Sequence, residues 1–165
     1  MACSRPVIRP ARADDLPALE GVRQAAFAPI FASFRSILGD DLYPLVQARE
    51  DEAQQNLLAS LLASGSGWEV FVAETADGVV GFVAFQVNQE ARVGEIGLNA
   101  VHPNHSGKGI GTLMYDFALA RMKDAGMRAA TVATGADASH APARRAYEKA
   151  GFTAQIPSVW LCRKL

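Results

Sequence analysis

Apolar residues in the first third of the chain fall mainly at helical spacing. Val7–Arg9 predicts a short strand, and a helix is predicted to begin near Asp14 or Asp15. Pro17 then lies in the first turn, where its missing N–H removes no helical hydrogen bond. This helix is supported by the spacing of Leu16, Leu19, Val22, Arg23 and Ala26. Four leucines predict a second helix over Asp51–Ala63, while the aromatic-rich stretch between the two fits no single period.

The spacing changes to that of strands from residue 68 onward. Residues 68–87 predict two strands joined by a tight turn at Asp77-Gly78, a dipeptide typical of two-residue hairpins. A third strand is predicted over residues 92–101. Helical spacing then returns from Ile110 and ends at Gly126, a typical C-terminal stop.

The last part of the chain alternates short elements. Residues 128–134 predict a strand, residues 141–151 a helix ended by Gly151, and residues 158–165 a final strand, with room for one more after Phe152. The order βααβββαβαβ is not a regular βαβ alternation. It predicts one mixed α/β domain of the α+β type over residues 1–165, with a central sheet of six to seven strands flanked by about four helices.

Composition narrows the classes of function. The chain has 165 residues and a net charge of −1, so no basic field favours nucleic acid or anionic lipid. No apolar run reaches the roughly 20 residues of a membrane span. The N-terminus lacks the apolar stretch of a secretory signal. Cys3 and Cys162 are expected to be reduced, which favours a cytoplasmic protein with no nucleic-acid or membrane partner.

A turn with three alternating glycines carries the strongest chemical signal. Gly107, Gly109 and Gly111 lie between a predicted strand and a predicted helix, with Lys108 among them. Backbone N–H groups at a helix start, freed of side chains, form an anion site to which a lysine adds a cation. The turn therefore predicts a phosphate-bearing ligand held mainly by main chain. A purely structural turn would need only one or two glycines.

Two common phosphate motifs do not match this turn. The nucleoside-triphosphate loop requires Ser or Thr after its lysine, but Lys108 is followed by Gly109. The dinucleotide fingerprint requires G-x-G-x-x-G directly after a strand and an acidic residue about 20 positions later. Here the pattern is G-x-G-x-G, five residues separate it from the strand, and Thr131 stands at the acidic position.

The segments "EIGLNAVHPNHSGKGIGTLM" and "APARRAYEKAGF" together resemble the GNAT family of N-acetyltransferases. The family signature, [QR]-x-x-G-x-[GA], corresponds to Ser106–Gly111. The resemblance implies acetyl-CoA as the acyl donor and no metal. Ser106 replaces the usual Gln or Arg, and His140 replaces an Asn that often contacts the cofactor. The implied cofactor-binding residues are Asn99, Ala100, Val101, Ser106, Gly107, Lys108, Gly109, Ile110, Gly111, Thr112 and His140.

The same resemblance implies two catalytic residues. Tyr147 is the candidate general acid for the leaving thiolate, although a core aromatic at this position needs no such role. Glu95 is the candidate base, directly or through water, although a strand carboxylate is also explained as an edge charge. If strict alternation holds, Glu95 shares a face of its strand with Gly97 and Asn99. His102 and His105 flank a proline without a nearby third ligand, which argues against a metal site.

The acceptor is not specified by these residues. A small amine, an amino acid, an antibiotic and a protein N-terminus all stay open, and the resemblance allows a homodimer. Two functions from different classes follow. One is an enzyme that moves acetyl from acetyl-CoA to a primary amine by direct attack in a ternary complex. The alternative is a non-catalytic module that binds and senses acyl-CoA.

Overall fold

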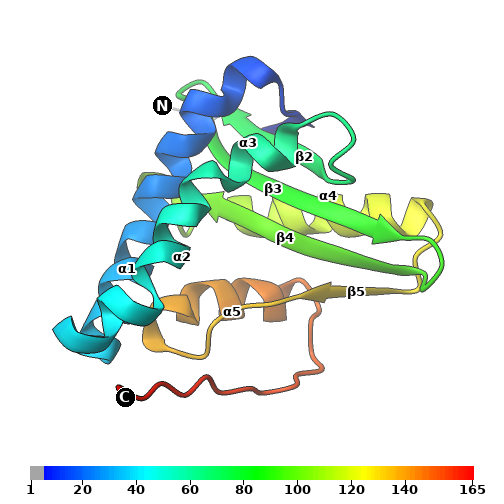
Figure 1. Ribbon diagram of the computed structural model, residues 1–165. Helices are drawn as coiled ribbons and strands as arrows, with labels where there is room; N and C mark the ends of the chain where they lie inside the picture. The colour runs from blue at the N-terminus through cyan, green and yellow to red at the C-terminus, as the bar shows by residue number, and fades with distance from the viewer. Residues whose placement is uncertain (1–5) are drawn as a thin grey trace.

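A computed structural model describes residues 6–165, in which five strands form one open sheet (Figure 1). The strands are β1 (Val7–Pro10), β2 (Glu69–Thr75), β3 (Gly78–Asn88), β4 (Val93–Val101) and β5 (Ala129–Val132), in that order across the sheet. The first four are antiparallel neighbours, and β5 runs parallel to β4. The predicted hairpin is confirmed, with Gly78 in the left-handed region at φ 94°.

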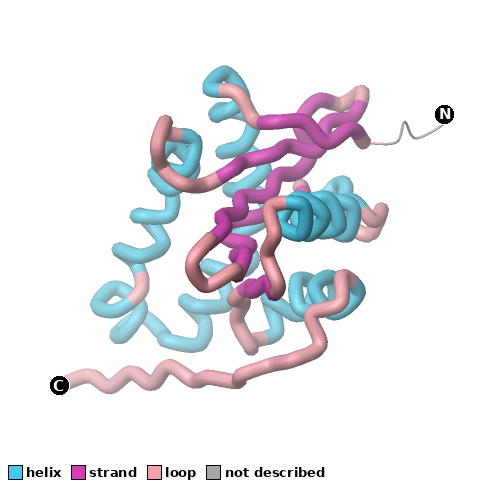
Figure 2. The backbone as a smooth tube through the Cα atoms, turned by 90° about the vertical axis from the view of Figure 1, so that its right-hand side faces the viewer, coloured by secondary structure: helices cyan, strands magenta, loops and turns pink. Residues whose placement is uncertain are grey.

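Helices cover both faces of the sheet (Figure 2). They are α1 (Leu16–Val46), α2 (Ala48–Ala53), α3 (Leu57–Leu62), α4 (Ile110–Asp124) and α5 (Ala141–Lys149). The first three lie on one face, and α4 and α5 lie on the other. A short 3-10 turn joins α2 to α3, so together they form one helical arm. The mixed α+β architecture with four helical units is therefore confirmed.

The core consists of two apolar layers separated by the sheet. Val83, Phe85 and Ile96 pack against α4 and α5, whereas Val72 and Phe82 pack against α1 and α3. Both layers contain residues that are almost fully buried. Alternation along β3 supplies side chains to both, because successive strand residues point to opposite faces.

The segment without a clear period is helical. Helix α1 continues through it to Val46, but Gly39 has φ 69° and ψ 176°, so two helices meet there. Glycine is suited to this break because a left-handed φ strains other residues. The predicted second helix is also interrupted: α2 starts before Asp51, and the 3-10 turn precedes α3.

The predicted strands after Phe152 are wrong. Residues 153–165 are extended but carry no regular structure, and the sheet has five strands rather than six or seven. Ile156, Val159 and Leu161 are each at least 86% exposed. A strand needs a neighbouring edge, and within residues 6–165 the backbone of this segment has no strand partner. Its alternating apolar residues therefore form no strand.

Two other expectations concern the chain as a whole. Cys3 lies outside the described residues, and Cys162 is a partly exposed free thiol. Among residues 6–165, no helix combines the length and the apolar character needed to cross a bilayer.

An ion-pair cluster joins β1, β2 and the start of α1. The Arg9 guanidinium donates to both oxygens of Asp15 at 2.7 and 2.9 Å, and to both oxygens of Glu74 at 2.8 and 3.1 Å. The Arg9 hydrogen bond is the main reason that the pKa of Asp15 falls from 3.8 to about 2. Bidentate contacts between a guanidinium and a carboxylate are among the strongest charge-assisted hydrogen bonds in proteins.

Replacing Asp15 with Asn should lower the free energy of unfolding by about 2 kcal/mol at pH 7, because the native state favours the ionised carboxylate. The depressed pKa means that this stabilisation is complete above about pH 4 and is lost as the pH falls toward about 2. Urea denaturation between pH 7 and pH 3 should show the difference between the parent and Asp15→Asn narrowing with acid. Asp14→Asn, an exposed neighbour in the same turn, is the matched control. An equal loss in both variants at every pH would contradict the assignment.

Candidate active site

The parallel strands β4 and β5 separate before β4 ends. Their pairing runs from Val93–Ala129 to Ile96–Val132, and β4 then continues to Val101 without a partner on that side within residues 6–165. Main-chain groups along Gly97–Val101 that have no strand partner on this side therefore border an opening in the sheet. An exposed strand edge of this kind can pair with an extended ligand, as it would with another strand.

A β-bulge in β4 changes which side chains face each layer. Val83 pairs with Asn99 and Phe85 with Ile96, so Gly97 and Leu98 together oppose a single residue of β3. After the bulge, Asn99 points toward α4 and α5, because it contacts side chains on these helices. Glu95 points to the opposite face, where it pairs with Gln86. The expectation that Glu95 and Asn99 share a face is therefore wrong, because the extra residue reverses the alternation.

Three polar side chains meet on the α4–α5 side of the opening. Asn99 Nδ2 donates to Tyr147 Oη at 2.9 Å, and Tyr115 Oη donates to Asn99 Oδ1 at 2.7 Å. The two tyrosine rings are 5.0 Å apart between centroids. Burial raises the pKa of both hydroxyls, and for Tyr147 the hydrogen bonds of Asn99 and Tyr115 oppose this rise. Tyr147 is therefore a buried, protonated hydroxyl beside the free edge of β4.

The glycine turn leads directly into α4. Gly107 and Gly109 have φ of 75° and 78°, and Ile110 is buried in the core, which fixes the start of the helix. In the described part of the chain, six consecutive N–H groups from Gly107 to Thr112 have no acceptor; Leu113 is the first to donate, to Gly109. The turn, Ser106 and the Lys108 side chain are exposed. Free donors at the positive end of a helix dipole form an anion-binding site.

His140 forms part of a compact polar cluster between β5 and α5. His140 Nδ1 lies 2.5 Å from Asp137 Oδ1, and Ser33 of α1 donates to Asp137 Oδ2 at 2.9 Å. Burial alone would raise the pKa of Asp137, but hydrogen bonds from Ser139, His140 and Ser33 outweigh it and the pKa lies well below its usual range. A Cβ on Gly135 would lie 2.5 Å from His140 Nδ1, so glycine leaves room for this pair.

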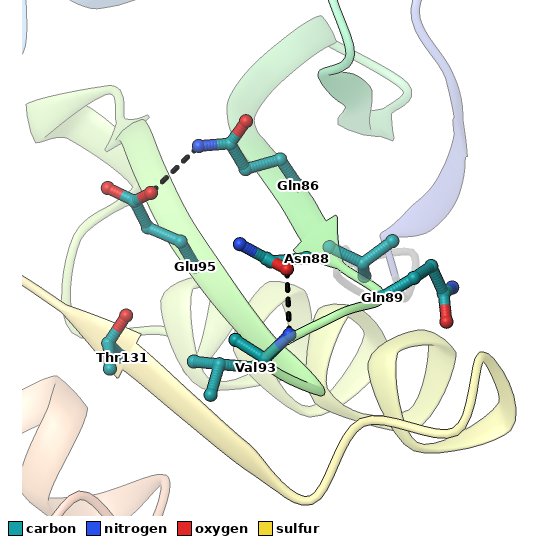
Figure 3. A pocket seen from close by; sticks show the side chains of 8 residues that line it. Gln86, Asn88, Gln89, Val93, Glu95 and Thr131 are labelled. Carbon is teal, nitrogen blue, oxygen red and sulfur yellow. Dashed lines mark hydrogen bonds between the residues drawn. The ribbon is translucent and has the colours of Figure 1, made fainter.

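Glu95 borders an open depression of about 680 Å³ on the face opposite Tyr147. The lining residues are Gln86, Val87, Asn88, Gln89, Ala91, Val93, Glu95 and Thr131. Gln86 Nε2 donates to Glu95 Oε2 at 2.8 Å, and the carboxylate is exposed (Figure 3). Glu95 pairs with Thr131 of β5 one position before the strands separate. The depression therefore adjoins the opening from the other side of the sheet.

The structure places the two predicted catalytic residues on opposite faces of the sheet. Asn99 and Tyr147 are in contact on one face of the sheet, and Glu95 lies on the other. Tyr115 and Asp137 were not predicted, because one lies on the buried face of an amphipathic helix and the other in a loop, where neither position signals function. No group of three His, Cys, Asp or Glu residues suited to a metal occurs among the described residues. His102 Nδ1 instead accepts from the Asn104 N–H at 3.2 Å.

Comparisons with known proteins identify the family of this chain and solved structures that share its fold. The sequence profile of the Acetyltransferase (GNAT) family matches residues 31–152. A comparison with curated proteins found no significant sequence match. The solved structures that share the fold include the ribosomal-protein-S18-alanine N-acetyltransferase from Escherichia coli, which has a TM-score of 0.66 and 18% identity over 92% of this chain and 79% of that one.

Two further structures share the fold at low sequence identity. A GNAT family acetyltransferase from Brucella melitensis, in complex with acetyl-CoA, has a TM-score of 0.60 and 23% identity over 90% of this chain and 83% of that one. An aminoglycoside 6'-N-acetyltransferase from Acinetobacter haemolyticus has a TM-score of 0.63 and 14% identity over 96% of this chain and 99% of that one. With the profile match over most of its length, the chain belongs to the GNAT family of acetyltransferases.

Gly97→Ala should destabilise the protein by about 1–3 kcal/mol, because a Cβ at this position would overlap the Trp68 ring. The added methyl group must displace either the indole or the bulge. Thermal unfolding and tryptophan fluorescence measure the two effects. Gly21→Ala is the matched control: it lies in α1 with no atom within 4 Å of the added Cβ, and should be stabilising by about 0.5–1 kcal/mol. Gly97→Ala as stable as the parent would show that the bulge does not depend on this contact.

Proposed function

We propose that this chain is a single acetyltransferase unit that moves the acetyl group of acetyl-CoA to a primary amine. The observation that carries the proposal is the continuity of three features on one side of the sheet. The unpaired N–H groups of Gly107–Thr112 border the same opening as the free edge of β4 and the Tyr147 hydroxyl. Acetyl-CoA has phosphates at one end, amide groups along its length and the reacting thioester at the other end. These parts match, in the same order, the glycine turn, the free edge of β4 and the Tyr147 hydroxyl.

The glycine turn binds the pyrophosphate of the donor in this proposal. Main-chain N–H groups supply most of the contacts, so Ser106 in place of the usual Gln or Arg does not remove the site. Lys108 is exposed beside the turn and adds a positive charge. The amide groups of the pantetheine arm pair with the free edge of β4 over Asn99–Val101, and His140 lies two helical turns before Tyr147 at the start of α5.

The acetyl group is transferred through the opening between β4 and β5. A neutral amine attacks the thioester carbon, the C–S bond breaks, and the thiolate takes a proton from Tyr147, which regains it from solvent. Glu95, directly or through a water molecule, accepts the proton that the amine loses. Donor and acceptor therefore reach the reacting carbon from opposite faces, because Tyr147 and Glu95 lie on opposite sides of the sheet.

The lining of the depression favours a cationic, hydrogen-bonding acceptor. Glu95 is the one charged residue among those that line it, and Gln86, Asn88, Gln89 and Thr131 supply neutral polar groups. A protonated amine is attracted to the carboxylate before it loses its proton. Structures that share this fold include enzymes named for a ribosomal protein and for aminoglycosides, whose amines have these properties. These contacts support an amino sugar, a polyamine or a peptide N-terminus.

Gly109→Glu should weaken acetyl-CoA binding at least tenfold, about 1.4 kcal/mol, because it places a carboxylate beside the pyrophosphate. Isothermal titration with acetyl-CoA and with CoA measures the effect. Gly67→Glu is the matched control, because Gly67 is also exposed, has a φ of 80° and leaves open space for a Cβ. Equal affinity of both variants would contradict the assignment of the turn. Binding by the parent without transfer to any amine would favour the acyl-CoA sensor instead.

Tyr147→Phe and Glu95→Gln should alter different limbs of the pH–rate profile. Loss of the general acid should lower kcat about 100-fold and remove the alkaline limb, whereas loss of the base should remove the acidic limb. The measurement is release of the CoA thiol with the most active amine from a panel of glucosamine, spermidine, kanamycin and an alanine-first peptide. Acetyl-CoA affinity should stay close to that of the parent in both variants. Unchanged turnover in Tyr147→Phe would exclude this tyrosine as the acid.

A further inference from the structure

We infer that Tyr115 is a positioning residue that acts through Asn99 to keep the hydroxyl proton of Tyr147 available for the leaving thiolate. This inference rests on the proposed function, because it assigns the proton of Tyr147 to the acetyl-transfer step. Among the hydrogen bonds of the described residues, Tyr115 on α4 reaches the free edge of β4 only through the Asn99 side chain.

The Asn99 amide uses both of its hydrogens and its oxygen within this cluster. Nδ2 donates one hydrogen to the Gly97 carbonyl and the other to Tyr147 Oη, both at 2.9 Å. Oδ1 accepts from Tyr115 Oη at 2.7 Å. An amide turned by 180° would place Oδ1 against the Gly97 carbonyl oxygen, where neither atom can donate. The Gly97 carbonyl therefore selects one orientation of the amide, and the Tyr115 hydroxyl donates to the oxygen that this orientation presents.

The selected orientation decides how the Tyr147 hydroxyl is used. Because Asn99 Nδ2 donates to it, the Tyr147 oxygen accepts, and its own proton is directed elsewhere. The competing bond, from Tyr147 to Asn99 Oδ1, is longer at 3.3 Å and shares that oxygen with the shorter Tyr115 bond. A sulfur that carries negative charge in the opening is a stronger acceptor than this shared amide oxygen. The Tyr147 proton is therefore released toward the opening when the thiolate forms.

Burial makes Tyr115 suited to this role. Its side chain is 4% exposed, and burial, followed by its interaction with Tyr147, raises the pKa of its hydroxyl far above the usual range. Tyr115 therefore keeps its proton and stays a donor to Asn99 while Tyr147 cycles through tyrosinate. The N–H of Asn99 also stabilises that tyrosinate, since a hydrogen bond to the charged form favours it. Tyr115 on α4 thus remains a hydrogen-bond donor throughout the reaction, and Tyr147 on α5 supplies the proton that is transferred.

The test compares Tyr115→Phe, which removes only a hydroxyl, with Asn99→Leu and Tyr147→Phe. Tyr115→Phe should lower kcat about tenfold, as expected for one hydrogen bond, with acetyl-CoA affinity unchanged. When residues act together as one connected group, the effects of their substitutions on kcat are not additive. Tyr115→Phe should therefore cause no further loss of kcat in the Asn99→Leu background or in the Tyr147→Phe background. Thiol release at saturating acetyl-CoA with the same amine measures all six proteins, including the parent.

Tyr43→Phe is the matched control for loss of a buried hydroxyl. Tyr43 donates to Asp51 at 2.6 Å between α1 and α2 and makes no hydrogen bond to Asn99, Tyr115 or Tyr147, so its loss should lower the Tm but leave kcat unchanged. Additive losses in the double variants, or weaker acetyl-CoA binding in place of a lower kcat, would overturn the inference. If Tyr115→Phe fails to fold, a seventh protein that combines Asn99→Leu with Tyr147→Phe tests the relay, and additive losses of kcat in it would overturn the inference. Unchanged turnover in Tyr147→Phe would reject the proposed acid itself, a separate outcome.

Discussion

The early end of the pairing between β4 and β5 is the constraint on which the rest of the structure depends. The two strands share four paired positions, after which β4 continues and β5 gives way to the loop before α5. That loop does not return to the sheet, because Arg144 holds the carbonyls of Gly135 and Asp137 at 2.6 and 2.8 Å. Asp137 is in turn fixed to Ser33 of α1. The strands are therefore held apart by specific contacts at the end of β5.

Different side chains line this separation on its two faces. Tyr147 reaches Asn99 from α5 across the gap, and Tyr115 approaches it from α4. On the opposite face, Trp68 covers Gly97, and Glu95 stands exposed beyond it. The opening is consequently asymmetric: one face presents buried hydroxyls and free N–H groups, and the other presents a carboxylate. This asymmetry suits a reaction in which one partner receives a proton and the other gives one up.

The sequence was informative where local chemistry alone determines structure. Gly78, Gly107 and Gly109 all adopt positive φ at the turns that their spacing indicated, and α4 begins at Ile110 as predicted. The sequence was less informative where contacts between residues far apart in the chain determine the local structure. The bulge at Gly97–Leu98 depends on pairing with β3, which no alternation within β4 reveals. Tyr115 has the spacing of an ordinary core residue, and its partner is 16 positions away on a different element. The last segment has the pattern of a strand, but a strand also requires an available edge.

The bulge in β4 makes the arrangement of this site depend on the backbone conformation just before Asn99 as much as on the residues of the cluster. If β4 kept both Gly97 and Leu98 but alternated regularly through them, Asn99 would turn to the face of α1, away from both tyrosines, although every side chain of the cluster would still be in the chain. The spacing between Ile96 and Asn99 is in that sense part of the site, although the two residues between them donate no side-chain group to it.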